Sequence, residues 1–244
     1  MKPIAYKEMY ENELSHPWYT YTRKRLLRTF KTLIKTEAKI LDLGCGTGGT
    51  LIKLKDAGFK NIYGLDKSNA AIEYCKKRKL ENLVIGNINT LPYKAKSFDA
   101  IVCLDVLYHE GVNLELALNE IYRVLKRGGI CYLQEPALDW LKSQHDLAVE
   151  TKTRFTKTIL TSALRRKRFR IIYSTYYNTF LLPFIILKRL IDKTRKKDQV
   201  SSDVYQLPPV ISAVFSFVLN FENIITLNSG SLPFGLSIII VSKK

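Results

Sequence analysis

The residues best suited to bind a ligand are glycines and carboxylates between Asp42 and Asp66. A short apolar run ends in a segment where glycine recurs at Gly44, Gly46 and Gly48. Glycine permits a positive φ angle and lets a ligand touch the backbone, and a helix that begins behind the turn would offer free N–H groups. Asp66 ends the next apolar run, where a carboxylate can bind both hydroxyls of a ribose. The pattern predicts a nucleoside-binding turn between a strand and a helix.

Asp42 distinguishes between two kinds of nucleoside cofactor. Gly44-x-Gly46-x-x-Gly49 also fits the fingerprint of dinucleotide-binding proteins, which alone is a weak signal. A carboxylate two residues before the first glycine would repel a pyrophosphate, but it would attract a ligand that carries an ammonium and a sulfonium. S-adenosylmethionine is such a ligand, and it has a ribose for Asp66. The charges therefore favour S-adenosylmethionine over NAD.

Four separated segments between Ile40 and Glu135 resemble the class I S-adenosylmethionine-dependent methyltransferases, in particular the type 11/25 methyltransferase-domain group. The resemblance implies S-adenosylmethionine as cofactor and a Rossmann-like sheet of seven mostly parallel strands. It implies a reaction that needs neither a metal nor a nucleophilic cysteine. The four segments are Leu41-Asp-Leu-Gly-Cys-Gly-Thr-Gly-Gly49, the strand end at Asp66, Gly86-Asn-Ile-Asn-Thr-Leu-Pro92 with Ser97-Phe-Asp99, and Leu125-Lys-Arg-Gly-Gly129.

The resemblance also implies cofactor contacts at matching positions. Asn87 stands where the family usually has Asp, and its amide oxygen can still accept a hydrogen bond from the adenine amine. The other implied contacts are those of Asp42 with the amino end, Asp66 with the ribose hydroxyls, Gly44, Gly46 and Gly48 with the methionine and ribose portions, Ile88 with the adenine, and Leu104 with the cofactor.

Both ends of the chain are similar to a bacterial subgroup with an HWWF lead-in. Ser15-His-Pro-Trp-Tyr19 resembles that lead-in, and Arg154-Phe-Thr-Lys157 resembles an RRYTR step, although the Gly-His pair that usually precedes the step is absent. The subgroup is associated with polyprenyl-linked sugars and cell-surface glycans. It implies an acceptor that is a small molecule or a lipid-linked sugar, methylated on oxygen.

His109 is the leading candidate for a general base. It follows the expected strand over residues 98–104, where the acceptor should arrive, and the ordinary pKa of histidine is about 6.5. A base is needed only where the acceptor starts protonated. His109 can instead cap the next helix or shape the pocket. Further candidates, each with a packing or surface role as the alternative, are Tyr108, Glu135 at the pocket edge, His145, His16, Tyr19 and Trp18.

Alternating strands and helices must position these residues. Near-continuous apolar strands separated by helices predict an α/β fold, a doubly wound, mostly parallel sheet with helices on both faces and ligands at the carboxyl ends of its strands. Helical cap elements are expected before residue 39 and late in the chain. Strands are expected at 39–43, 61–65, 83–85, 98–104, 130–134, 169–174 and 234–241, and helices at 47–57, 69–79 (with Ser68 as N-cap), 113–125, 155–164, 180–191 and 209–219.

Length and composition predict one domain with a substantial core. The chain has 244 residues, of which 46% are hydrophobic, and this excludes a disordered tail, a fibre or a disulfide-rich miniprotein. Its four cysteines lie far apart in apolar runs, so we expect reduced, packed thiols and no zinc site. The single domain 1–244 is expected to comprise a helical lead-in at 1–38, a cofactor-binding core at 39–135 and a substrate-side region at 136–244.

The net charge of +17 is concentrated late in the chain. Residues 150–199 contain 14 Lys or Arg and three acidic residues. Such a block attracts the phosphates of nucleic acid or of an anionic membrane surface, or it is simply a solvated face. No secretory signal and no apolar run of about 18 residues is evident. We therefore expect a cytoplasmic protein, soluble or peripheral at the inner face of the membrane, with apolar stretches at 180–190 and 209–221 lying in a bilayer interface or covering the substrate pocket.

Three functions follow from these observations. The first is methyl transfer to a small-molecule or lipid-linked glycan acceptor. The second is RNA methylation, suggested by the charge; Leu104-Asp-Val106 differs from the Asn-Pro-Pro-Tyr type of strand end, and no RNA-binding module is recognisable, so nucleic acid is the less favoured partner. The third is a non-catalytic protein that binds S-adenosylmethionine, which the intact glycine and aspartate positions argue against.

Overall fold

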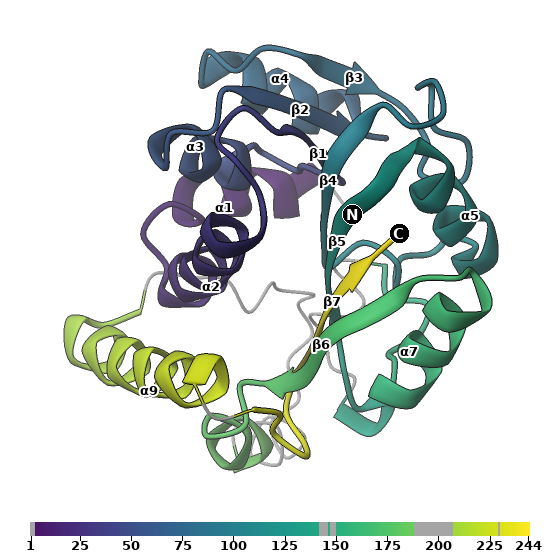
Figure 1. The fold of residues 1–244 in the computed structure, drawn as a ribbon. Helices are drawn as coiled ribbons and strands as arrows, with labels where there is room; N and C mark the ends of the chain where they lie inside the picture. Colours follow the sequence, from purple (N-terminus) through teal and green to yellow (C-terminus); the bar gives the residue numbers. More distant parts are fainter. Residues whose placement is uncertain (1–2, 142–145, 147–149, 188–206, 229) are drawn as a thin grey trace.

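Seven strands form one sheet in the computed structural model, which describes residues 3–141, 146, 150–187, 207–228 and 230–244. The spatial order is β3-β2-β1-β4-β5-β7-β6 (Figure 1). The first five strands run parallel, and β7 is antiparallel to both of its neighbours, so the expected mostly parallel sheet is confirmed. The strands are β1 Lys39–Leu43, β2 Asn61–Asp66, β3 Leu83–Ile85, β4 Phe98–Leu104, β5 Leu125–Pro136, β6 Arg170–Tyr177 and β7 Ser237–Lys243.

Helices cover both faces of the sheet, as the doubly wound pattern predicts (Figure 1). The helices α2, α3 and α9 share one side with α1 and α4, whereas α5 and α7 lie on the other. The elements are α1 Pro3–Asn12, α2 Pro17–Leu33, α3 Gly49–Asp56, α4 Asn69–Lys77, α5 Leu114–Val124, a short 3-10 helix Asp139–Leu141, α7 Lys157–Arg166 and α9 Pro209–Asn228, and residues 182–187 are also helical.

The central strand β4 is buried from both sides because it supplies side chains to two cores. Ile101 and Cys103 pack with α5 and α7, whereas Ala100 and Val102 pack with α2 and α3. This alternation explains why β4 is almost entirely apolar in sequence. Capping side chains fix where the helices begin, and Ser68 accepts a hydrogen bond from Ala71 N as expected of an N-cap.

The structure differs from the sequence expectations mainly at element ends. The polar lead-in contains a helix of its own, α1, and β5 begins at Leu125 rather than at residue 130. The helix expected at 180–191 is described only to residue 187, and the basic linker 192–203 lies outside the described residues. The four cysteines are buried and free, as expected.

Helix α9 is longer than expected, and it contains a longer apolar segment than the sequence pattern indicated. It continues to Asn228 instead of ending at residue 219, and its segment Pro209–Thr226 is long and apolar enough to cross a membrane by length and composition alone. The sequence pattern missed this because polar residues, among them Glu222 and Asn223, interrupt the apolar run. Because these polar residues are buried against the rest of the protein, the helix continues past residue 219 along the protein surface.

Candidate functional site

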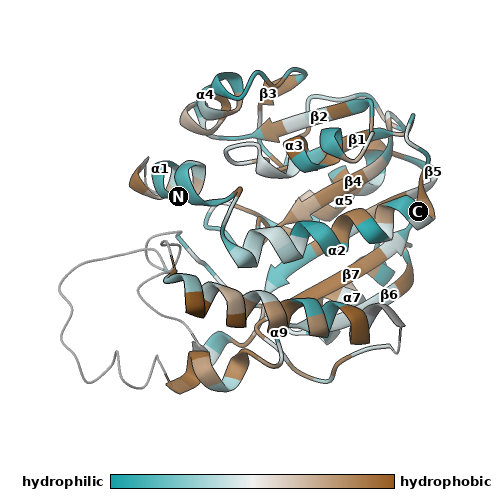
Figure 2. Ribbon diagram, turned by 90° about the vertical axis from the view of Figure 1, so that its left-hand side faces the viewer, coloured by the Kyte–Doolittle hydropathy of each residue, from teal (hydrophilic) through white to brown (hydrophobic). Residues whose placement is uncertain are grey.

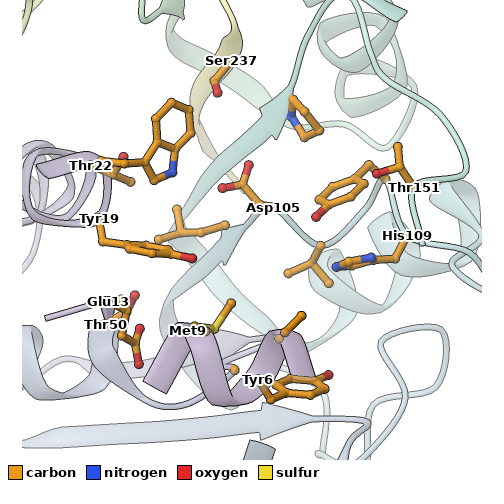
Figure 3. Close-up of a pocket in the computed structure, with 18 of the residues that line it drawn as sticks. Tyr6, Met9, Glu13, Tyr19, Thr22, Thr50, Asp105, His109, Thr151 and Ser237 are labelled. Carbon is orange, nitrogen blue, oxygen red and sulfur yellow. The ribbon is translucent and has the colours of Figure 1, made fainter. Parts of the chain in front are cut away.

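A cavity of about 630 Å³ lies at the carboxyl ends of β1, β2 and β4 and is closed on one side by α1 and α2 (Figure 3). A parallel sheet places its ligands at this edge, because the strand order reverses direction between β1 and β4. His109 lines the cavity, and so do most of the predicted cofactor contacts: Asp42, Gly44, Gly46, Asp66, Asn87, Ile88 and Leu104.

The glycine turn has the backbone conformation that its sequence predicts. Gly44, Gly46 and Gly48 have φ angles of 69°, 54° and 91°, which other residues adopt only with strain. A Cβ on Gly44 would lie 2.4 Å from Val106 Cγ2, so a side chain there would displace the cavity wall. Gly48 is not among the lining residues. It faces Leu80 of the segment after α4, where a Cβ would approach to 2.4 Å, so its glycine serves packing and the start of α3.

Asp66 is held in place by the backbone of the turn. One carboxylate oxygen accepts a hydrogen bond from Gly46 N and the other from Ser68 N, both at 2.9 Å. Each oxygen keeps a second lone pair, and the residue lines the cavity. Burial raises its pKa, an effect that the two N–H groups oppose. The arrangement leaves a fixed acceptor pair at the edge of the cavity, as a ribose diol requires.

Asp42 is buried and faces the same cavity. It is 2% exposed, and no described residue gives its carboxylate a hydrogen bond or an ion pair. Burial raises its pKa to about 8, the nearby carboxylates of Glu13 and Asp66 add to the rise, and the charge of Arg23 opposes it. An unmatched buried carboxylate favours a cationic ligand. The described residues therefore fit S-adenosylmethionine, which brings positive charge and a ribose.

Glu13 is a residue of this site that the sequence analysis missed. Its buried side chain accepts hydrogen bonds from Thr47 and from Gly49 N, the latter at 3.1 Å, and it pairs with Arg23 and Arg78. These contacts join the α1–α2 junction to the glycine turn and to the end of α4. A single acidic residue in a polar lead-in gives no sequence signal, because its partners lie up to 65 positions away.

Asp105 is a second residue whose importance only the structure shows. It follows β4 directly, has a φ angle of 56° and lines the cavity (Figure 3). Gln134 Nε2 donates a hydrogen bond to its carboxylate at 3.1 Å. Burial raises its pKa to about 7, an effect that this hydrogen bond and the charge of Arg154 oppose. A carboxylate with such a pKa can exchange a proton near neutral pH.

Glu135 does not face the pocket edge as expected. It is fully buried, and its carboxylate accepts hydrogen bonds from the backbone N–H groups of Val106, Leu107 and Tyr108 at 3.2, 2.9 and 3.2 Å. Burial is the main reason that its pKa is raised. Glu135 therefore fixes the turn that carries Asp105 and His109, and it does so from outside the cavity lining.

His109 lies on the cavity wall beside Thr151, away from Tyr19 and Thr22 (Figure 3). Its ring is 4.2 Å from the ring of Tyr108, measured between centroids. A role for His109 in proton transfer stays a prediction.

The remaining candidates have mixed placements. Trp18, Tyr19, Tyr108 and His16 all line the cavity, and His16 Nδ1 also accepts a hydrogen bond from Trp18 N as the N-cap of α2. The amide oxygen of Asn87 accepts a hydrogen bond from Asn89 N at 2.9 Å, which leaves it one free lone pair. His145 lies outside the described residues.

Beyond Asp105 the cavity continues into an apolar arm built by the C-terminal region. In Figure 3, Ser237 lies across Asp105 from Met9 and Thr50, which mark the glycine-turn side. The arm draws its side chains from the helical residues 182–187, the start of α9 and the entry to β7. Its lining residues are Phe184, Ile185, Leu207, Pro208, Ile211, Phe215 and Leu236.

Comparison with known proteins agrees with this geometry. The methyltransferase domain family matches residues 41–133. An uncharacterised protein of Methanocaldococcus jannaschii is 31% identical over 192 residues, which are 74% of this chain and 78% of that protein. The sterol 24-C-methyltransferase of Debaryomyces hansenii is 36% identical over 107 residues, but the match covers only 41% of this chain and 28% of that enzyme.

Among solved structures, the fold is similar to a crystal structure described as a putative sarcosine dimethylglycine methyltransferase from Galdieria sulphuraria. The TM-score is 0.62 at 17% sequence identity, and the likeness covers 93% of this chain and 86% of the other. At this identity the likeness establishes the fold alone.

Proposed function

The chain belongs to the class I S-adenosylmethionine-dependent methyltransferases, and from this we propose that it methylates a hydroxyl group of a small-molecule or lipid-linked sugar acceptor. The observation that carries the proposal is the shared cavity. The glycine turn, Asp42 and Asp66 line one part of it, the apolar arm is another part, and Asp105 lies between Ser237 on the arm side and Met9 on the glycine-turn side (Figure 3). A cofactor and an acceptor with an apolar portion can therefore meet beside Asp105.

The cofactor end provides binding and orientation. When bound, S-adenosylmethionine supplies an activated methyl group on a sulfonium, so the protein need not activate the leaving group. Asp42 would hold the cationic amino end, and Asp66 would accept hydrogen bonds from the ribose hydroxyls. The backbone of Gly44 and Gly46 would approach the ligand closely, since neither residue has a side chain there.

Asp105 would act on the acceptor. A hydroxyl oxygen is a weak nucleophile, and it needs a base that removes its proton as the methyl group is transferred. The carboxylate of Asp105 lies in the cavity with a pKa of about 7, so it is largely ionised slightly above neutral pH. The side chains of Tyr19 and Tyr108 line the same space and would limit the entry of water.

The acceptor class is tested with labelled S-adenosylmethionine and a fractionated cell extract. We expect the label in the lipid or small-molecule fraction, in material that carries a sugar. Label in the RNA fraction would instead support RNA methylation, the alternative that the net charge of +17 favours. Binding of the cofactor with no labelled product in any fraction would support a non-catalytic binding protein.

The role of Asp105 is tested by Asp105→Asn. We expect kcat to fall about 100-fold, because a general base typically contributes at least that much, while the Kd for S-adenosylmethionine stays unchanged. In the wild type, kcat should rise with pH and level off above about 7, since the protonated carboxyl cannot accept a proton. The Asp105→Asn variant should lack this rising limb of the pH profile of kcat. If His109→Gln removes the limb and Asp105→Asn keeps it, His109 is the base.

A further inference from the structure

Helix α9 exposes an apolar face and buries several polar side chains beside the apolar Leu219, unlike an ordinary surface helix. Its buried side includes Glu222, Asn223 and Thr226, which are polar and at most 1% exposed. Its outer side is apolar, and Val210 and Phe217 are 76% and 74% exposed. A helix on a water-exposed surface normally shows the reverse pattern. The outward residues recur every three or four positions and form one stripe, which we call the α9 stripe: Val210, Val214, Phe217, Phe221 and Ile224.

Specific hydrogen bonds fix α9 in this orientation. Asn223 Nδ2 donates to the carbonyl oxygen of Tyr21 at 3.1 Å, and Thr226 accepts a hydrogen bond from Arg25. The carboxylate of Glu222 accepts hydrogen bonds from Thr179 N and Phe180 N at 3.1 and 3.2 Å. Rotation of the helix would break these bonds and leave buried polar groups without partners, which is costly. The α9 stripe therefore stays on the outside.

Neighbouring residues extend the α9 stripe toward the cavity. Phe180 is exposed, and its ring lies 5.8 Å from that of Phe221, measured between centroids. Phe184, further along the same segment, is 65% exposed and also lines the apolar arm, as does Ile211 of α9. The apolar surface and the apolar arm of the cavity are thus continuous.

Basic side chains border the α9 stripe along α2. Lys24, Arg28 and Lys31 are exposed and share one face of that helix, at spacings of four and three residues. Lys24 Nζ donates a hydrogen bond to Asn220 of α9 at 2.9 Å, so this face lies next to α9. Figure 2 shows the two helices side by side, with much of α9 hydrophobic. Neither helix exposes an acidic side chain, since Glu222 is buried.

We propose that the α9 stripe and the basic face of α2 form a surface that docks on an anionic lipid bilayer. An apolar helix face flanked by basic residues is suited to the bilayer interface, where the apolar side chains enter the acyl region and the cations meet the headgroups. Phe184 and Ile211, which are exposed and also line the apolar arm, then lie next to the lipid. The inference rests on the proposed function only in that a lipid-linked acceptor would enter there.

Other occupants fit this surface less well. A second copy of the chain would bring the basic faces of two α2 helices close together, which is electrostatically unfavourable. The segment between residues 187 and 207 has nine charged residues among 19 and so is a poor cover for an apolar stripe. A spanning orientation of α9 would require the hydrogen bonds of Asn223 and Thr226 to break.

Vesicle sedimentation of the full chain tests the docking surface. We expect the protein to sediment with phosphatidylcholine vesicles that contain phosphatidylglycerol, less so at high salt. Phe217→Ser with Phe221→Ser should lower the partition coefficient at least about tenfold, because two exposed aromatic side chains no longer enter the bilayer. Leu116→Ser with Ile159→Ser, which removes exposed apolar side chains from α5 and α7, should bind as the wild type does.

The basic border is tested in the same assay. Lys24→Gln, Arg28→Gln and Lys31→Gln together should remove the preference for phosphatidylglycerol. A control with the same net charge, in which exposed residues elsewhere are changed, should keep the preference: Lys55→Gln, Lys94→Gln and Arg165→Gln.

Two results would overturn the proposal. One is equal sedimentation of the wild type and the Phe217/Phe221 variant. The other is a dimer of the wild type in size-exclusion chromatography that the same variant dissociates, without any vesicle binding. Retained binding of S-adenosylmethionine verifies that each variant is folded. Because no acceptor is present, the docking result is independent of which fraction receives the labelled methyl group.

Discussion

At the scale of single residues, the two carboxylates of the cofactor end are held in contrasting ways. Asp66 has a backbone N–H on each of its oxygens, whereas Asp42 has no hydrogen bond from any described residue. The charge of Asp42 is thus unfavourable in the protein alone and favourable when a cation binds. This contrast predicts that the Asp42 carboxylate increases the affinity for a cationic ligand and lowers the stability of the protein without that ligand.

The prediction for Asp42→Asn concerns stability as a function of pH. In the folded protein its pKa is about 8, compared with roughly 3.9 for Asp in the unfolded chain. The folded state therefore binds this proton more tightly, and the wild type loses stability as the pH rises from about 4 to about 8. The variant lacks this loss. We expect the variant to exceed the wild type in free energy of unfolding by more at pH 9 than at pH 5, measured by urea denaturation.

The same variant should bind S-adenosylmethionine more weakly at pH 8, as measured by calorimetric titration. Asp99→Asn is the matched control, because Asp99 is paired with Lys126 outside the cavity. A stability difference between Asp42→Asn and the wild type that does not change with pH would contradict the assigned burial of the charge.

At the scale of elements, the N-terminal helices are attached to the cofactor end by Glu13. Residues of α1, including Tyr6 and Met9, line the cavity, and Met9 lies against Gly46. The ion pairs of Glu13 with Arg23 and Arg78 are almost fully buried. They therefore hold α1 and α2 over the glycine turn.

We predict that Glu13→Gln lowers the free energy of unfolding by about 3 kcal/mol, because it leaves two buried guanidinium groups without a countercharge. Urea denaturation measures the change. Glu37→Gln is the control, since the pair of Glu37 with Lys60 is exposed and should contribute less than about 1 kcal/mol. Similar losses from the two variants would show that the Glu13 cluster does not hold these helices.

At the scale of the whole molecule, the cavity is bounded by segments from both ends of the chain. Residues 5–23, the glycine turn and residues 207–237 all contribute to its lining. A ligand that binds there contacts both ends of the chain, so we expect it to raise the free energy of unfolding of the whole fold. The size of this increase therefore shows which cofactor the cavity accepts.

We predict that S-adenosylmethionine at 100 times its Kd raises the free energy of unfolding by about 2.7 kcal/mol. At pH 9, where Asp42 is ionised, NAD at the same concentration should give no shift, because the buried carboxylates repel its pyrophosphate. Thermal denaturation with each cofactor measures the difference. Stabilisation by NAD alone would contradict the charge argument based on Asp42 and Asp66.

The sequence alone predicted the fold class and most of the residues that line the cavity on the side of the glycine turn. Local patterns were sufficient there: apolar runs identify strands, the glycines identify a turn, and Asp42 and Asp66 stand at fixed distances from it. The parallel sheet then brings these strand ends together. Ser68 as an N-cap was predictable for the same reason, since its partner Ala71 lies three residues away.

Contacts between distant segments were decided only by the tertiary structure. Glu13 meets Arg78 across 65 positions, and Glu135 reaches the turn after β4 across 27 to 29 positions. The orientation of α9 also depends on where Tyr21 and Arg25 of α2 lie. Sequence periodicity shows that a helix has two unlike faces, but only packing determines which face is buried. The reversed polarity of α9 was therefore invisible until α2 was in place beside it.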